Sequence, residues 1–209
     1  MNKTLTLAVI ATLTVGSNQV YAGPTNLVVN GGFETGSFTG WVDDTGGAPP
    51  GIVVVAEGAP VPGWCCGTLT PYAGTYLAVL GANSADNTLS QTFTTTLAGQ
   101  TYDLSFAFTS AADALPIGDF TVLWDGKTLM SYVSTNPVSP PVYPVWETPE
   151  FQVTGTGHDT LQFVSRQDPS WFGLDNVSLT VDPVSEPNSL ALCGIGLLGF
   201  LGACYRKIR

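Results

Sequence analysis

The side chains that could perform acid–base chemistry are few in this chain of 209 residues. His158 is the one histidine; it lies in a Gly-Thr-Gly-His-Asp stretch typical of a turn, and no Gly-x-Ser-x-Gly or His-Glu-x-x-His motif accompanies it. Glycoside hydrolysis needs two carboxyl groups facing each other across a cleft, and the candidates are Asp43 with Asp44 and Glu147 with Glu150. Both pairs stand beside loops rich in Pro and Gly, where acids are commonly solvated. The sequence favours a non-catalytic protein, with a secreted hydrolase as an alternative.

Aromatic side chains offer a different chemistry, because their faces can stack on the C–H faces of sugar rings. Of the five Trp residues, Trp41 and Trp124 stand in strand-like alternation, which predicts that they are buried. Two others lie in long loops, each with a Tyr near it in sequence, where a binding site would be built. The candidate glycan-binding residues are therefore Trp64, Tyr72, Tyr143 and Trp146.

Cysteine placement argues against a metal–thiolate site, because none of the four Cys residues forms a C-x-x-C motif. Cys193 and Cys204 lie in an apolar C-terminal run, whereas Cys65 and Cys66 are adjacent. In an oxidising compartment the adjacent pair could close a vicinal disulfide that stiffens the Trp64 loop, bridge to another chain, or remain as two thiols.

The net charge of the chain limits the kinds of molecule that it can bind. The chain has 6 bases and 16 acids, and four of the bases belong to its two ends: Lys3, Arg206, Lys207 and Arg209. Residues 23 to 184 contain 15 acids and only two bases, Lys127 and Arg166, which gives this part of the chain a net charge of 2 − 15 = −13. Such a body repels phosphate backbones, so nucleic acid is excluded as a partner.

The elements that must position these residues are strands. From Asn26 onward, short apolar or alternating runs are interrupted by Gly, Pro, Asn and Asp, and none repeats with the helical period. The expected strands are Asn26–Asn30, Gly40–Asp43, Ile52–Glu57, Thr75–Leu80, Thr88–Thr94, Thr101–Ser110, Asp119–Trp124, Thr128–Ser134, Glu150–Thr154, Thr160–Arg166 and Phe172–Val181.

Alternation is clearest between Tyr102 and Phe108, and Asp125-Gly126 marks a tight hairpin. Three irregular stretches, 44–51, 58–71 and 134–146, are predicted loops. The pattern predicts an all-β fold: a single antiparallel β-sandwich with jelly-roll or related topology over residues 23–182.

Both chain ends have the composition of addressing segments. Residues 1–22 are typical of a signal peptide, with Lys3, an apolar stretch and a Val-Tyr-Ala cleavage site ending at Ala22. The far end, residues 183–209, has Ser185-Glu186-Pro187, an apolar run over 190–205 and a basic terminus over 206–209. Sixteen helical residues span about 24 Å, slightly less than a ~30 Å hydrocarbon layer, and the basic terminus would stay on the cytoplasmic side.

This tail resembles the PEP-CTERM sorting signal, with Ser185 in place of the first Pro and with Glu186 and Pro187 as the rest of the motif. The resemblance implies a Gram-negative bacterium that makes extracellular polysaccharide. It also implies processing by an exosortase-type enzyme, transient anchoring in the inner membrane, and a final place at the cell surface or outside the cell. A simple tail anchor is the alternative.

The folded body carries a second resemblance. Residues 26–34, Asn-Leu-Val-Val-Asn-Gly-Gly-Phe-Glu, followed by Gly40-Trp41, are similar to the N-terminal signature of galactose-binding-like jelly rolls, which occur in many carbohydrate-binding modules. Residues 172–179 resemble their closing strand, and 72–77 and 89–93 fit the same order. The resemblance implies this fold, and it implies a structural calcium ion held by Glu34 and Asp175.

Together these features predict an exported, non-catalytic surface or matrix protein that associates with extracellular polysaccharide, as in a biofilm. A passive surface protein without a sugar site is the main alternative.

Overall fold

A computed structural model describes residues 25–44, 51–60, 68–81, 85–111, 118–134, 145–167 and 171–181. The signal peptide, the sorting tail with Ser185, Glu186 and Pro187, and the loop residues Trp64, Cys65, Cys66 and Tyr143 lie outside these ranges. Within them, no helix is long and apolar enough to span a membrane.

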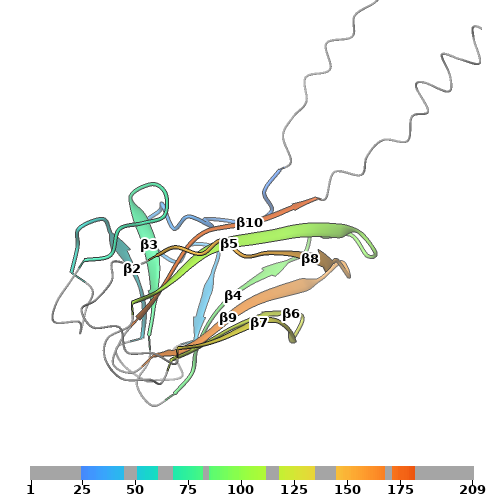
Figure 1. Ribbon diagram of the computed structural model, residues 1–209. Coiled ribbons are helices and arrows are strands. Elements are labelled where there is room, and N and C mark those ends of the chain that lie inside the picture. Colours follow the sequence, from blue (N-terminus) through green and yellow to red (C-terminus); the bar gives the residue numbers. More distant parts are fainter. Residues whose placement is uncertain are drawn as a thin grey trace, which may run out of the picture.

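The described residues form ten strands in two antiparallel sheets that pack face to face (Figure 1). Sheet A has the order β1-β4-β9-β6-β7 and sheet B the order β2-β3-β10-β5-β8. The strands are β1 (Val42–Asp44), β2 (Ile52–Ala56), β3 (Tyr76–Leu80), β4 (Asn87–Phe93), β5 (Thr101–Ala111), β6 (Gly118–Trp124), β7 (Lys127–Ser134), β8 (Glu150–Thr154), β9 (Asp159–Gln167) and β10 (Trp171–Val181).

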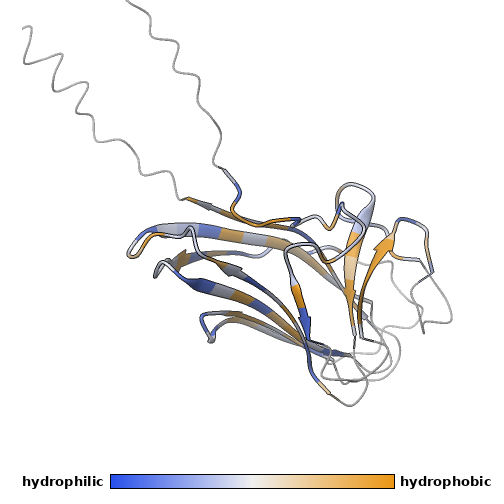
Figure 2. Ribbon diagram, turned by 180° about the vertical axis from the view of Figure 1, so that it is seen from behind, coloured by the Kyte–Doolittle hydropathy of each residue, from blue (hydrophilic) through white to orange (hydrophobic). Residues whose placement is uncertain are grey.

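Two-residue alternation builds the core between the sheets. On β6, Phe120 and Val122 are fully buried while Asp119 is exposed to solvent. Figure 2 shows the same alternation of hydrophilic and hydrophobic residues along the strands of sheet A. Phe120 stacks on Phe108 of β5 with ring centroids 5.2 Å apart, so the inner faces of the two sheets interdigitate. Trp41 and Trp124 are 7% and 6% exposed, which confirms both as core residues.

Strands β2 and β3 are apolar on both faces, and Figure 2 shows β2 and most of β3 in the hydrophobic colour. Ala78 and Leu80 face the main core, whereas Leu77 and Val79 join a second cluster on the outer face of sheet B. That cluster also contains Trp171, and Trp146 packs against it. Because loop segments cover this outer face, one part of sheet B is buried on both sides.

The hairpin expected at Asp125-Gly126 is confirmed. Asp125 and Gly126 have φ of 50° and 74°, the positive values of a two-residue turn that matches strand twist, and they join the paired strands β6 and β7.

The strand expected at Asn26–Asn30 is wrong. Its main chain lies beside β10, but side chains take the places of ladder partners: the Asn26 Oδ1 atom accepts the N–H of Leu179 at 2.9 Å. The Gln91 amide exchanges two hydrogen bonds with the main chain of Val29, at 2.8 and 3.0 Å. Hydrogen bonds that involve side-chain amides therefore satisfy much of this backbone without a continuous strand ladder. The other expected strands match the observed ones to within two residues at either end.

Candidate functional site

Two of the four expected glycan-binding aromatics lie in the described residues, and they are in contact. The rings of Tyr72 and Trp146, 74 positions apart (146 − 72), meet edge to face with centroids 5.9 Å apart and an interplanar angle of 66°. Tyr72 is 45% exposed, Trp146 is partly buried, and the neighbouring Val145 is 72% exposed. We call the surface formed by Tyr72, Val145 and Trp146 the aromatic platform.

The Trp146 side chain is fixed at three points. Its Nε1–H donates to the Thr70 carbonyl at 3.2 Å, one ring edge meets Tyr72, and the ring packs over Gly173 of β10. A Cβ added to Gly173 would lie 3.1 Å from Cη2 of Trp146 and 2.9 Å from Cγ2 of Thr109, closer than ordinary contacts. The glycine therefore makes room for the indole.

The main chain around Trp146 is tied to β5. Glu147 and Phe108 exchange two main-chain hydrogen bonds of 2.9 Å, and the Thr109 hydroxyl donates to the Val145 carbonyl at 3.0 Å. Trp146 is thus presented by a short bridge on a central strand, which limits its movement.

The turn that carries Tyr72 is held by the two acids expected to bind calcium. Glu34 accepts the main-chain N–H groups of Thr75 and Tyr76 at 3.0 to 3.1 Å, and Asp175 Oδ2 accepts that of Ala73 at 3.0 Å. Gly74 lies between these donors at φ 70°, where a Cβ would stand 2.2 Å from the Glu34 carboxylate. Glu34 and Asp175, from the two ends of the sandwich, thus hold the same turn.

Electrostatics at this turn bear on the calcium prediction. Burial raises the pKa of Asp175, whose side chain is fully buried, and the charge of Glu34 adds to the rise, although the N–H groups of Ala73, Asn176 and Tyr72 oppose it. A cation would relieve this excess of negative charge. Among the described residues, however, no group of three or more His, Cys, Asp and Glu side chains comes together. Calcium stays a prediction, and main-chain carbonyls and water would have to supply its other ligands.

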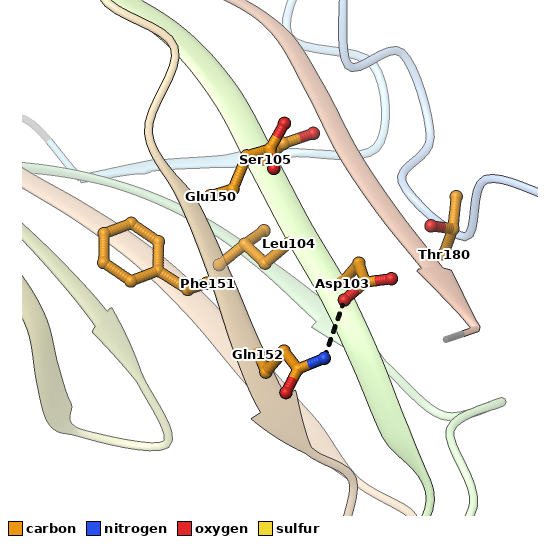
Figure 3. Close-up of a pocket in the computed structure, with 7 residues that line it drawn as sticks. All are labelled: Asp103, Leu104, Ser105, Glu150, Phe151, Gln152 and Thr180. Atoms are coloured by element: carbon orange, nitrogen blue, oxygen red, sulfur yellow. Dashed lines mark hydrogen bonds between the residues drawn. The ribbon is translucent and has the colours of Figure 1, made fainter. Parts of the chain in front are cut away.

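A polar pocket of about 530 Å³ lies on the outer face of β8, β5 and β10 (Figure 3). Asp103, Ser105, Glu150 and Gln152 stand on it, and Gln152 Nε2 reaches Asp103 Oδ1 at 3.5 Å. Phe151 points away from these side chains in Figure 3 and stacks on Phe106 of the core. Although Phe151 lines the pocket, no aromatic ring among the described residues faces into it for a sugar.

The two pairs of acids considered for hydrolysis lie at different sheet edges of the described sandwich. Asp43 and Asp44 belong to β1 at the edge of sheet A, whereas Glu150 belongs to β8 at the edge of sheet B. Burial first, and then the charge of Asp44, raises the pKa of Asp43. His158 is exposed in the turn before β9, as its sequence context predicts.

Asp159, next to His158, is a fully buried acid that the sequence analysis missed. It accepts the Thr96 hydroxyl and the Thr156 N–H, the latter at 2.8 Å, and so joins the loops that precede β5 and β9. Burial alone would raise its pKa, but the hydrogen bonds from Thr96, Thr156 and Asp125 outweigh burial and lower it. Its role is structural.

Two face-to-face antiparallel sheets in this strand order make the protein a jelly-roll β-sandwich, the architecture of carbohydrate-binding modules, and confirm the predicted fold class. No family model and no curated protein matches the chain. Among solved structures, it is similar to TmCBM61 in complex with β-1,4-galactotriose, at 19% identity and a TM-score of 0.54, covering 76% of this chain and 99% of that one. It is also similar to the K1 and K3 cleaved adhesin domains of Lys-gingipain from Porphyromonas gingivalis W83. These have 15% and 17% identity, both with a TM-score of 0.54; they cover 72% and 76% of this chain and 96% and 99% of theirs.

Proposed function

We propose that this protein is a non-catalytic polysaccharide-binding protein that contacts a neutral glycan through the aromatic platform. The observation that carries the proposal is the contact between exposed Tyr72 and partly buried Trp146. A hydrogen bond to Thr70 and packing over Gly173 hold the indole in place. A fixed aromatic surface loses little conformational entropy when a ligand binds. The likeness to a module crystallised with β-1,4-galactotriose supports the same ligand class.

The charge of the body selects the kind of polysaccharide. With 15 acids against two bases between residues 23 and 184, the domain repels uronate-rich and sulfated chains at a distance. Glu147 flanks Trp146 and adds to that repulsion locally. A neutral chain carries no such penalty, and its hydroxyl groups can donate to exposed carboxylates.

The cellular setting in this proposal rests on the sequence of the two ends. Residues 1–22 direct export, and the PEP-CTERM-like tail at Ser185, Glu186 and Pro187 directs an exosortase-type enzyme to the chain while the 190–205 segment lies in the inner membrane. The mature domain then reaches the cell surface or the extracellular matrix and associates with the polysaccharide there.

The test is a titration of the mature domain with β-1,4-galactotriose and with neutral and acidic polysaccharides, followed by calorimetry and Trp fluorescence. We expect Tyr72→Ala and Trp146→Ala each to weaken binding about tenfold, because a central aromatic contact is worth more than 1 kcal/mol. Leu97→Ala is the control, since Leu97 is 66% exposed and distant in sequence from the platform. Absence of saturable binding to every neutral polymer would leave the passive surface protein, and release of new reducing ends would indicate a hydrolase.

A further inference from the structure

The outer face of sheet A carries a second polar pocket, on the side of the sandwich opposite the aromatic platform. Alternation on β9 places Phe163 and Ser165 toward the core and Val164 and Arg166 outward. Figure 1 shows β9 beside β6 in the layer opposite β10, and the register sets Arg166 directly across from Asp119 of β6. Arg166 is one of only two bases between residues 23 and 184.

Opposite charges line this pocket, and they form no ion pair among the residues that the structure describes. The pocket has a volume of about 330 Å³ and is lined by Arg166, Asp119, Asp86 and the hydroxyl-bearing Thr121 and Ser131, among others. The Nε atom of Arg166 is buried and has no hydrogen-bond acceptor among the described residues. The Nε–H of Arg166 can therefore donate to an oxygen atom that enters the pocket.

The chemistry of the lining selects that oxygen. Two carboxylates beside one guanidinium disfavour an anion, and the guanidinium disfavours a metal cation. A hydroxyl group satisfies both sides, because its oxygen accepts from Arg166 Nε–H while its proton is donated to Asp119. Two neighbouring hydroxyls, as on a sugar ring, can hydrogen-bond at the same time to a guanidinium and to the carboxylate beside it.

We propose that Arg166, Asp119 and Asp86 form a second carbohydrate subsite, which binds a neutral vicinal diol by hydrogen bonds without aromatic stacking. It deepens the proposed function by adding a contact on the opposite face of the sandwich. Its residues share no side chain with the aromatic platform, so either site can fail without the other. Since it lacks an aromatic face, its affinity for a single sugar unit is low, and consecutive units of one oligosaccharide add to the binding.

The test follows backbone amide and Arg166 Nε–H signals by NMR during titration of the mature domain with β-1,4-galactotriose and, separately, cellotriose. We expect saturable shifts at Asp119, Thr121 and Arg166 with at least one of the two sugars. Arg166→Gln and Asp119→Asn should each weaken that response about tenfold. Lys127→Gln is the matched control, because it removes one positive charge from the same sheet, outside the pocket.

A second set of measurements separates this subsite from the platform. Trp146→Ala should leave the Arg166 response unchanged even where it abolishes binding at the platform, and both pocket variants should keep the wild-type unfolding midpoint to within a few degrees. The subsite is refuted if neither trisaccharide produces a saturable shift at Arg166, or if Arg166→Gln retains the response at Asp119. A response to sulfate or calcium in place of the sugars would also overturn it.

Discussion

Gly173 beneath Trp146 allows the position of the indole to be tested without touching an exposed residue. In Gly173→Ala the new methyl group would stand 3.1 Å from Trp146 Cη2 and 2.9 Å from Thr109 Cγ2, where 3.4 to 4 Å is ordinary contact. Such overpacking costs about 1–3 kcal/mol, and the lower backbone entropy of Ala in the unfolded chain returns about 0.5–1 kcal/mol. We therefore expect a net loss of about 1–2 kcal/mol in the free energy of unfolding.

The indole can relieve the clash only by moving outward, which strains its 3.2 Å hydrogen bond to Thr70 and its contact with Tyr72. Thermal unfolding should show the midpoint lowered by roughly 2–8 °C for a domain of this size. Glycan affinity should fall in the same variant, although Gly173 itself is buried.

A double-mutant cycle with Trp146→Ala assigns the loss to the Trp146 contact. With the indole absent, the added methyl group meets only Thr109 and Leu77, so Gly173→Ala should cost about 1 kcal/mol less than in the wild type. An equal cost in both backgrounds would refute the reasoning that Gly173 seats Trp146.

Three further outcomes are expected. Calcium should raise the unfolding midpoint and a chelator lower it, with the response lost in Glu34→Gln and in Asp175→Asn; an unchanged wild-type midpoint would exclude the ion. The folded-state pKa of Asp159 lies below its ordinary 3.8, so its stabilisation is complete above that value and is lost as pH falls through the folded pKa. Chemical denaturation should therefore show the stability gap between wild type and Asp159→Asn closing on acidification, and a gap independent of pH would contradict this. Intact-mass measurement of the surface fraction should find a chain that begins at Gly23 and lacks 190–209, and a recovered species that retains the tail would disprove processing.

The fold could be predicted from the sequence because its signals are local. Alternation from Tyr102 to Phe108 specifies which face of β5 is buried, and Asp125-Gly126 specifies the turn after β6. The strand predicted at Asn26–Asn30 is wrong because its apolar run is strand-like, while several of its hydrogen bonds join it to distant residues through side-chain amides. Nothing in the run itself reveals that Gln91 would pair with it.

The site could be predicted only in part. The sequence predicts Tyr72 and Trp146 as loop aromatics. Their contact, however, depends on the turn that Glu34 holds and on the packing of the indole over Gly173, and each of these residues is distant in sequence from the ring that it positions. Gly173 carried a usable signal, because a glycine between apolar residues of a strand often marks a close approach. The sequence does not indicate which ring would approach it.

The position of β10 has a mechanical consequence for a chain held by its C-terminal end. This strand lies between β3 and β5, and its pairing with β5 runs from Trp171–Ala111 to Val181–Tyr102. A force applied beyond Val181 along the strand loads the hydrogen bonds between β10 and β5 together in shear, instead of breaking them one at a time. The N–H of Leu27 donates to the Leu179 carbonyl at 2.8 Å and adds to the attachment at the loaded end. Resistance to extraction is then governed by the unfolding rate, so a tethered domain can withstand flow that its equilibrium stability alone would not predict.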